Sequence, residues 1–322
     1  MRTIAIEEHF ASQALGSDIH TKIDRSASNW ATDSADANPT RDLFELGDPR
    51  IRNMDANGID LQVLSHIYFD IAQATPELVR SSNDELAKAV SSRPTRYSAF
   101  ASLPMMNPEA AADELERAAK THGFKGALVN GNVEGKFLDD PSFTPVFERA
   151  VELDVPIYLH PGFPPKAVYD AYYRGLDPKM SFTLSTTGWG WHSEVGLHSL
   201  RLIVSGLFER LPNLQMIIGH MGEMLPFMFT RFDNELPPEQ TGLQEKVTTY
   251  LQRNFHITTS GLFSDSSLQA AIQTFGVDRI IFSVDYPLAS NPHARAFFDG
   301  ATMSDADRAK ISFENVTKLL KL

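Results

Sequence analysis

Eight short apolar runs that alternate with longer amphipathic stretches constrain the fold of this 322-residue chain more than any other feature. The runs are Ile4–Glu7, Ile59–Leu64, Tyr97–Ala101, Gly126–Val129, Pro156–Leu159, Leu214–Ile218, His256–Thr259 and Arg279–Phe282. Helical periodicity is found between them at Pro76–Ser92, Pro108–Thr121, Phe143–Leu153, Ser193–Leu207 and Ser266–Phe275. Strands that alternate with helices predict parallel βα units, and eight such units close most simply into a barrel. We therefore predict an α/β fold, a (β/α)8 TIM barrel, which suits this length.

Two segments interrupt the alternation. Residues 11–48 are polar and lack a clear period, so we predict a long excursion after the first strand. Residues 161–192 follow the fifth strand and are rich in Gly and aromatic side chains, as a substrate lid or a subunit contact would be. We find no internal repeat and no low-complexity linker, so we predict a single barrel domain over residues 1–322 with two loop excursions.

Charge and composition narrow the range of partners and sites. The 41 acidic and 29 basic residues give a net charge of −12, which disfavours nucleic acid and anionic membranes as partners. The start "MRTIAIEEHF" has no apolar segment before its acidic residues, and no run is long enough to span a bilayer, so we expect a cytoplasmic protein. The chain has no cysteine, so any metal ion must be held by His and carboxylate groups.

Polar, chemically capable residues recur where the apolar runs end. They are Glu7, Glu8 and His9 after the first run, His66 after the second, His160 after the fifth, His220 and Glu223 after the sixth, and Asp285 after the eighth. Functional groups of a parallel barrel gather at the carboxyl ends of its strands, so these side chains are expected to lie near one another.

The stretch "TIAIEEHF" carries the first part of this pattern. Glu7 and His9 are two residues apart, so on an extended strand they point to the same side, and Glu8 points to the other. Together with His160 and Asp285 they offer two imidazoles and two carboxylates. Such a set suits a divalent cation; zinc tolerates it, and the oxygen ligands raise the odds of manganese.

Each of these features also has a purely structural interpretation. Glu7 and His9 could form a solvated strand end, and His160 before a proline could be a hydrogen-bonded core histidine. Asp285 could cap a helix or turn, and Glu223 in "GHMGE" could be a helix N-terminal acid. Four acidic or His groups at successive strand ends are harder to explain structurally than any one of them.

The motifs "EEHF", "YLHP", "GHMGE", "ITTSG" and "SVDYP", in this order, give the chain a family resemblance. It resembles the amidohydrolase superfamily, in its branch of metal-dependent aromatic acid decarboxylases related to aminocarboxymuconate semialdehyde decarboxylase. Within that branch it looks most like the γ-resorcylate and 2,3-dihydroxybenzoate decarboxylases. The similarity runs over essentially the whole chain, including "NPEAAADELERA" and "GFKGALVNG".

This resemblance implies one divalent metal ion, Zn²⁺ or Mn²⁺, held by Glu7, His9, His160 and Asp285, with no organic cofactor. It implies catalytic or supporting roles for His220 and Glu223, and it places Arg231 near the active site. It also implies a homodimer or homotetramer that acts on a small aromatic carboxylate.

The remaining site predictions come from sequence position. Asp285 is the predicted proton donor to the substrate ring, and Phe10 and Tyr286, which follow two of the metal ligands, are predicted substrate-binding walls. Trp189 and Trp191 are further candidate walls, equally suited to the barrel core or a subunit interface. His192, His198 and His256 are interpreted as structural, although His192 or His198 could also support a ligand.

The most economical function is non-oxidative decarboxylation of a hydroxybenzoate-like acid by protonation of the ring carbon. A lactonase-type hydrolase on the same scaffold is the alternative, because a metal-bound hydroxide would need the same ligands, with Asp285 as general base. A non-enzymatic binding barrel is the third hypothesis, and the complete set of four ligands argues against it.

Overall fold

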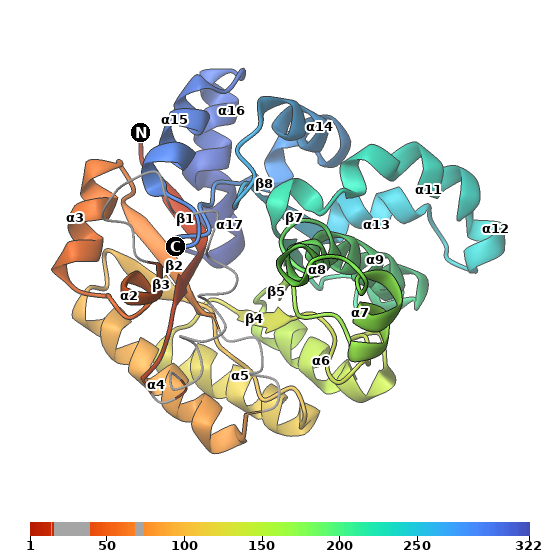
Figure 1. Cartoon of the computed structure of the whole chain (residues 1–322), viewed down its shortest axis with the longest axis horizontal. Helices are drawn as coiled ribbons and strands as arrows, with labels where there is room; N and C mark the ends of the chain where they lie inside the picture. Colours follow the sequence, from red (N-terminus) through yellow and green to blue (C-terminus); the bar gives the residue numbers. More distant parts are fainter. Residues whose placement is uncertain (14, 16–38, 68–73) are drawn as a thin grey trace.

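The computed structural model describes residues 1–13, 15, 39–67 and 74–322, and each predicted run overlaps one strand in it. The strands are β1 (Ile4–Phe10), β2 (Leu61–His66), β3 (Tyr97–Ala99), β4 (Ala127–Asn130), β5 (Ile157–His160), β6 (Met216–Ile218), β7 (Phe255–Thr258) and β8 (Ile280–Ile281). Figure 1 shows the strands at the centre of the molecule and the helices outside them. This arrangement is the layering expected of βα units.

The helices fill the connections between strands. The α-helices are α2 (Pro39–Leu43), α3 (Asp48–Ala56), α4 (Pro76–Ser92), α5 (Pro108–His122), α6 (Thr144–Leu153), α7 (Lys166–Tyr172), α8 (Pro178–Ser185), α9 (Gly190–Val204), α10 (Leu207–Arg210), α11 (Phe229–Glu235), α12 (Pro238–Thr241), α13 (Val247–Asn254), α14 (Asp265–Phe275), α15 (Asn291–Gly300), α16 (Asp305–Ala309) and α17 (Asn315–Leu320). Short 3-10 turns are η3 (Pro141–Phe143), η4 (His220–Gly222), η5 (Leu225–Met228) and η6 (Val277–Arg279), and η7 (Lys310–Glu314) is a π-helical turn.

All strand pairs are parallel and follow chain order, β1-β2-β3 in one sheet and β4-β5-β6-β7-β8 in the other. A parallel bridge between Ala101 and Ala127 connects β3 to β4. At the other seam the amide of His9 donates to the carbonyl of Tyr286, 2.7 Å away, so the segment after β8 lies against β1. These two connections close the ring, and the predicted (β/α)8 barrel is confirmed.

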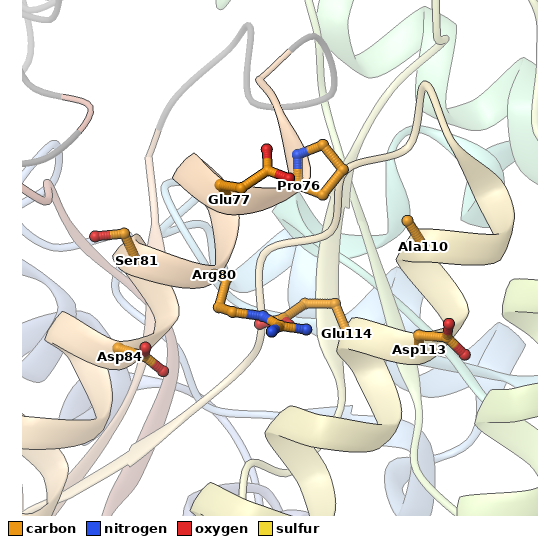
Figure 2. Close-up of a pocket in the computed structure, with 8 residues that line it drawn as sticks. All are labelled: Pro76, Glu77, Arg80, Ser81, Asp84, Ala110, Asp113 and Glu114. Atoms are coloured by element: carbon orange, nitrogen blue, oxygen red, sulfur yellow. The ribbon is translucent and has the colours of Figure 1, made fainter.

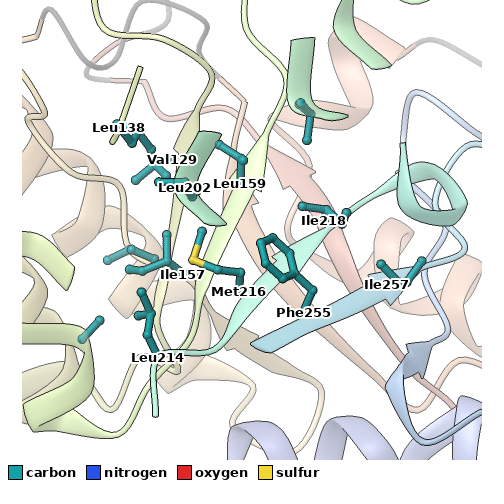
Figure 3. Packing of buried hydrophobic residues seen from close by; sticks show 14 of the residues in the cluster. Val129, Leu138, Ile157, Leu159, Leu202, Leu214, Met216, Ile218, Phe255 and Ile257 are labelled. Carbon is teal, nitrogen blue, oxygen red and sulfur yellow. The ribbon is translucent and has the colours of Figure 1, made fainter. Parts of the chain in front are cut away.

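Side-chain alternation along the strands separates two apolar layers. The barrel interior holds a cluster of strand residues, namely Ile4, Ile6, Leu61, Val63, Phe100, Leu128, Tyr158, Ile217 and Ile281. Val316 and Leu320 of α17 belong to the same cluster, so this C-terminal helix covers one end of the barrel. The intervening strand residues pack outward against the helices, and Figure 3 shows side chains from β4 to β7 gathered with Leu202 of α9.

Helix boundaries follow local capping chemistry, which explains why the predicted ranges agree so closely. Thr75 accepts a hydrogen bond from the amide of Leu78 at the start of α4, and Pro76 occupies the first turn. Asn107 caps α5 in the same way, and Gly123 ends that helix at φ 70°, where a residue with a Cβ would be strained.

The excursion after β5 differs from the prediction because most of it is helical. Residues 161–192 contain α7, α8 and the start of α9 rather than a loop. Asp177 caps α8 through the amides of Lys179 and Met180, and the Phe163 ring packs edge-on against Trp191 with centroids 6.0 Å apart. The aromatic side chains therefore pack on one another. The first excursion ends in α2 and α3, and its residues 14 and 16–38 lie outside the described part of the chain.

Within the described ranges, none of the helices has both the length and the apolar content needed to cross a bilayer.

Candidate metal centre

Strand β1 contains a β-bulge at Glu7, and this irregularity decides which side chains enter the barrel. The register against β2 shifts between Ile6 and Glu8, and Glu7 has a φ of 64°. Unbroken alternation from Ile4 and Ile6 would turn Glu7 and His9 outward. The bulge adds one residue and brings both inside, at a backbone cost of about 1–2 kcal/mol for a left-handed L-residue. The prediction that Glu7 and His9 share one side of the strand is confirmed. The β-bulge, and not simple alternation, turns that side toward the barrel interior.

Four predicted ligands converge at the carboxyl ends of β1, β5 and β8, and we call Glu7, His9, His160 and Asp285 the metal cluster. Ligand atoms of the first three all lie within 4.8 Å of one another. His160 Nε2 is 3.6 Å from Glu7 Oε1, and His9 Nε2 is 3.1 Å from Asp285 Oδ1. All four residues are buried. The sequence therefore predicted a constellation that the fold brings together.

Three polar atoms of the metal cluster make no hydrogen bond within the described part of the chain. Glu7 Oε1, His9 Nε2 and Asp285 Oδ1 are fully buried and have no hydrogen-bond partner among the described residues. Buried polar atoms are nearly always satisfied, because desolvation without a compensating contact is costly. Two carboxylate oxygens and two imidazole nitrogens around one point are the donor set of a divalent cation, so the residues present fit a metal ion.

Each ligand is held from behind by a polar neighbour. Glu7 Oε2 accepts hydrogen bonds from the hydroxyls of Tyr158 and Thr258, the latter at 3.2 Å, which leaves Oε1 turned to the centre.

The two imidazoles of the metal cluster are held through Nδ1. His9 Nδ1 lies 3.1 Å from Ser65 Oγ. Similarly, His160 Nδ1 lies 2.9 Å from the carbonyl of Pro161 and 3.0 Å from the Asn130 amide. Both imidazoles are engaged through Nδ1 and therefore present Nε2.

The Tyr158 hydroxyl gives a test of this support. We expect Tyr158→Phe to weaken metal affinity by about tenfold, the lower end of the range for groups that orient a metal ligand, because Glu7 Oε2 then loses one of its hydroxyl donors and keeps that of Thr258. Metal release to a chelator, followed in a competition titration, measures the change. Tyr250→Phe is the matched control, since Tyr250 donates to Glu209 2.8 Å away, far along the chain from the cluster. Equal metal affinity in the two variants would contradict the assigned role of Tyr158.

Beside the metal cluster lies a chain of three side chains, His192, Glu223 and His220. His220 Nδ1 is 2.7 Å from Glu223 Oε1, and His192 Nδ1 is 2.6 Å from Glu223 Oε2. His220 Nε2 is 3.9 Å from both Glu7 Oε1 and Asp285 Oδ2. His220 and Glu223 were predicted at this site. His192 was interpreted as structural or as a support for a ligand, and its contact with Glu223 could not be predicted because it reaches Glu223 from a separate helix.

The backbone after β6 is bent to present these groups. His220 and Glu223 both have positive φ, 48° and 51°, in a segment that turns tightly after the strand. A Cβ at Gly219 would lie 3.0 Å from Glu7 Oε2 and 3.1 Å from Ser260 Oγ, which explains the glycine in "GHMGE". Left-handed L-residues that persist at one site are a mark of a functional constraint.

The charges of His192, Glu223 and His220 strongly affect one another's pKa values. Burial would raise the pKa of Glu223, but His220 and His192 outweigh it and lower this pKa to about 2. Burial would likewise lower the pKa of His220, but Glu223 and Glu7 hold it well above its ordinary value. A cation bound to Glu7 would cancel the effect of the Glu7 charge on the pKa of His220, but the effect of the Glu223 charge would remain. His220 is thus kept as an imidazolium paired with a carboxylate.

Asp285 is ionised for a related reason. Burial would raise the pKa of Asp285, yet the neighbouring imidazoles of His220 and His9 lower it to about 2. Such a carboxylate carries no proton of its own at neutral pH. Any proton that Asp285 delivers must first reach it, and the side chain beside Oδ2 that holds a proton is His220.

A pocket of about 290 Å³ opens next to His220 and Glu223. Its apolar wall consists of Trp189, Met224, Phe227 and Leu262. Trp189 was a candidate wall, and its side chain lines this pocket; Trp191 is instead buried against Phe163. The combination of an apolar wall and a charged base is typical of small-molecule sites.

Three predicted substrate contacts are not brought to the metal cluster within one chain. Phe10 follows a ligand on the extended strand β1 and therefore turns to the opposite side, whereas Tyr286 follows Asp285, whose φ of 75° bends the backbone. The Phe10 ring packs edge-on against His66, with centroids 4.9 Å apart. Tyr286 lies under the Arg50 guanidinium, 4.8 Å from the ring centroid, and burial raises its pKa to about 12. Arg231 is 69% exposed on α11 and lies 3.8 Å from Glu235.

Glu8 points to the outer side of β1, as predicted, and takes part in a buried hydrogen-bond network there. It accepts from Gln62 Nε2 at 2.8 Å and from the amide of Val284 at 2.9 Å. Buried Arg50 donates to Gln62 Oε1 and to the carbonyl of His9, both at 2.7 Å. Burial raises the pKa of Glu8 to about 8. This network fastens the β1–β8 seam directly behind the metal cluster.

A groove elsewhere on the surface lacks comparable features. It has a volume of about 370 Å³ and lies between α4 and α5, where Figure 2 shows Arg80 reaching toward Glu114. Glu114 is engaged by Arg117 at 2.7 Å and by Asn83 at 2.7 Å. The groove-lining side chains of the described residues include no buried polar atom without a partner.

Comparison with known proteins agrees with this geometry. The amidohydrolase family model matches residues 17–322. A γ-resorcylate decarboxylase of Rhizobium radiobacter is 40% identical over 300 residues, which cover 87% of this chain and 88% of that protein.

Two solved structures extend the agreement to three dimensions. A dihydroxybenzoic acid decarboxylase from Polaromonas sp. JS666, with bound manganese and the inhibitor 2-nitroresorcinol, has a TM-score of 0.85 and 35% identity, covering 100% of this chain and 97% of that one. A 2,6-dihydroxybenzoate decarboxylase complexed with 2,6-dihydroxybenzoate has a TM-score of 0.84 and 36% identity, with complete coverage of both chains. The chain therefore belongs to the amidohydrolase family, in the branch that contains the aromatic acid decarboxylases.

Proposed function

We propose that this chain is a metal-dependent carboxy-lyase that removes CO2 from a hydroxylated aromatic carboxylic acid. One observation carries the proposal: three unpartnered ligand atoms of a buried two-carboxylate, two-imidazole cluster face one another beside a charged His220–Glu223 pair. The similarity to decarboxylases over nearly the whole chain supports it, at 35–40% identity.

The metal ion is proposed to be held by Glu7, His9, His160 and Asp285. A bound ion would supply Lewis acidity toward the oxygen atoms of the substrate. Manganese is favoured over zinc because half of the donors are carboxylate oxygens, and because a related decarboxylase was solved with manganese. No organic cofactor is needed for the reaction as proposed.

The protein groups move one proton. Decarboxylation requires a proton on the ring carbon that bears the carboxylate, so that the electrons of the breaking C–C bond return to the ring and CO2 leaves. His220 holds this proton, and Asp285 Oδ2, 3.9 Å from His220 Nε2, is positioned to receive it and pass it to the carbon. Glu223 stabilises the imidazolium and orients it, and His192 orients Glu223.

The lactonase-type hydrolase was the alternative, and none of the relatives described above supports it. The test uses the manganese-loaded protein with 2,6-dihydroxybenzoate, 2,3-dihydroxybenzoate and a set of lactones. We expect release of one CO2 per aromatic acid consumed and no lactone opening. Lactone turnover without CO2 from any hydroxybenzoate would reject the proposal.

A homodimer or homotetramer completes the proposal. Large apolar side chains are exposed on and near the excursion after β5, among them Tyr172, Leu176, Met180 and Phe227. Exposed apolar residues gathered in one region are typical of a subunit contact. In such an assembly, exposed Arg231 would be available to a neighbouring copy. The cytoplasmic location stays a prediction from the sequence.

A further inference from the structure

A cavity of about 790 Å³ lies at the end of the barrel opposite the metal cluster. It is bounded by the residues that precede β8, by the start of β7 and by α17, and we call it the floor cavity. Strands of a parallel barrel all run the same way, so His256 at the start of β7 lies at one end and Asp285 beyond β8 lies at the other. The floor cavity is therefore separate from the proposed active site.

His256 contributes a buried polar atom without a partner. The side chain lines the floor cavity, is 7% exposed, and its Nδ1 makes no hydrogen bond with any residue that the structure describes. Arg279 Nη1 lies 3.0 Å from His256 Nε2. Because a guanidinium has hydrogen-bond donors but no acceptor, Arg279 donates this bond and Nε2 accepts it. The neutral ring then carries its proton on Nδ1. Burial, together with the charges of Arg279 and Lys318, lowers the pKa of His256 to about 3, so this tautomer persists at neutral pH.

Two cationic side chains in the floor cavity have spare hydrogen-bonding capacity. Arg279 uses only Nη1, which contacts Gln215 Oε1 and His256 Nε2, both at 3.0 Å. Its remaining guanidinium N–H groups make no further hydrogen bond in the described part of the protein. Lys318 of α17 also lines the cavity and has no ion pair among the described residues. A planar guanidinium and an ammonium are the usual recognition groups for an oxyanion.

The other charges of the floor cavity largely cancel. Lys310 pairs with Asp278 at 2.7 Å, and Lys321 pairs with Asp154. Glu314 is the remaining carboxylate on the lining. Four cations and three carboxylates leave a local charge of +1, in a chain whose net charge is −12. The unneutralised positive charge therefore resides with Arg279 and Lys318, which line the same cavity as His256.

We propose that the floor cavity binds a small, doubly charged oxyanion of the phosphate or dicarboxylate class between Arg279, Lys318 and the Nδ1–H of His256. The anion accepts the hydrogen bond that His256 otherwise lacks, and it takes a fork of hydrogen bonds from the free edge of Arg279. The site requires neither the metal ion nor the aromatic substrate, so it stands independently of the proposed function.

Isothermal titration of inorganic phosphate into the manganese-loaded protein tests this site. The titration is run in chloride buffer, with 2-nitroresorcinol present to occupy the metal centre, and succinate replaces phosphate in a parallel arm. We expect one saturable site per chain, and the tighter of the two anions identifies the ligand class. Lys318→Met and Arg279→Lys should each weaken binding about tenfold, the loss of one charge-assisted contact.

Lys88→Met is the matched control, because Lys88 is an exposed helical lysine of α4 outside the floor cavity. This variant should bind phosphate as the unmodified protein does. His256→Asn should also weaken binding. If this variant of a buried residue fails to fold, Lys318→Met still tests the proposal, because Lys318 is exposed and its replacement should not disturb folding. Absence of saturable binding by either anion, or equal affinity in Lys318→Met and Lys88→Met, would overturn the proposal.

Discussion

Replacement of Glu7 by glutamine is expected to remove the metal ion and, with it, turnover. The substitution keeps the shape of the side chain but deletes the negative charge at Oε1, which lies 3.6 Å from His160 Nε2 and 3.9 Å from His220 Nε2 and accepts no hydrogen bond from the described residues. Groups that merely orient a ligand cost about 10–100-fold in affinity, so a ligand itself should cost more than 100-fold. Metal content after gel filtration and CO2 release measure the two losses.

The neighbouring carboxylate provides a matched control. Glu8→Gln makes the same chemical change one residue along β1, but Glu8 points away from the metal cluster toward Gln62 and Val284. Its pKa is raised to about 8 by burial, so a neutral amide resembles its own state at neutral pH. This variant should retain its metal. If Glu7→Gln and Glu8→Gln bound the same amount of metal, the bulge in β1 would not orient ligands as described.

The second large effect is expected at Glu223. Glu223→Gln should lower kcat by about 10²–10³-fold, within the usual range for general acid–base groups, while metal content stays unchanged. Without the carboxylate 2.7 Å from Nδ1, His220 loses the main contact that holds its pKa above the ordinary value. The active form needs protonated His220, so activity is present below this pKa and lost above it.

The pH profile separates this role from a structural one. When the pKa of His220 falls, the alkaline limb of kcat moves to lower pH in Glu223→Gln, whereas simple misfolding would scale the whole profile. Glu194→Gln is the matched control, because Glu194 pairs with buried His198 at 3.3 Å outside the metal cluster. A profile of unchanged shape in Glu223→Gln, or loss of its metal, would contradict the assignment.

How much of the protein could be predicted from sequence depends on how local the determining forces are. The boundaries of α4 agree with the prediction because Thr75 and Pro76 specify the start of that helix within a few residues. The eight strands were predictable because each is a short apolar run. By contrast, the helices within residues 161–192 depend on contacts among Phe163, Phe182 and Trp191, which no local period reveals.

The chemical groups of the site could be predicted from the sequence, but the directions in which several side chains point could not. Asp285 and His160 were recognisable because charged or imidazole groups directly after an apolar strand need a compensating partner. Phe10 and Tyr286 were assigned to the pocket by adjacency in sequence, but Phe10 points to the other side of β1, and the backbone bends at Asp285 before it reaches Tyr286. Tyr158 was missed because a tyrosine within an apolar run is indistinguishable from a core residue until its partner is known.

The order of the βα units and the chemical groups proposed to bind the metal ion could be predicted from the sequence, because apolar periodicity is a local constraint and the absence of cysteine is a compositional one. Which of these groups lie together depends on the packed barrel. A bulge at Glu7 turns two ligands inward, His192 reaches Glu223 from another helix, and the ring closure brings Asp285 to His9. These contacts join residues up to 276 positions apart, as for His9 and Asp285, and pairing over such distances is specified by the packed barrel as a whole.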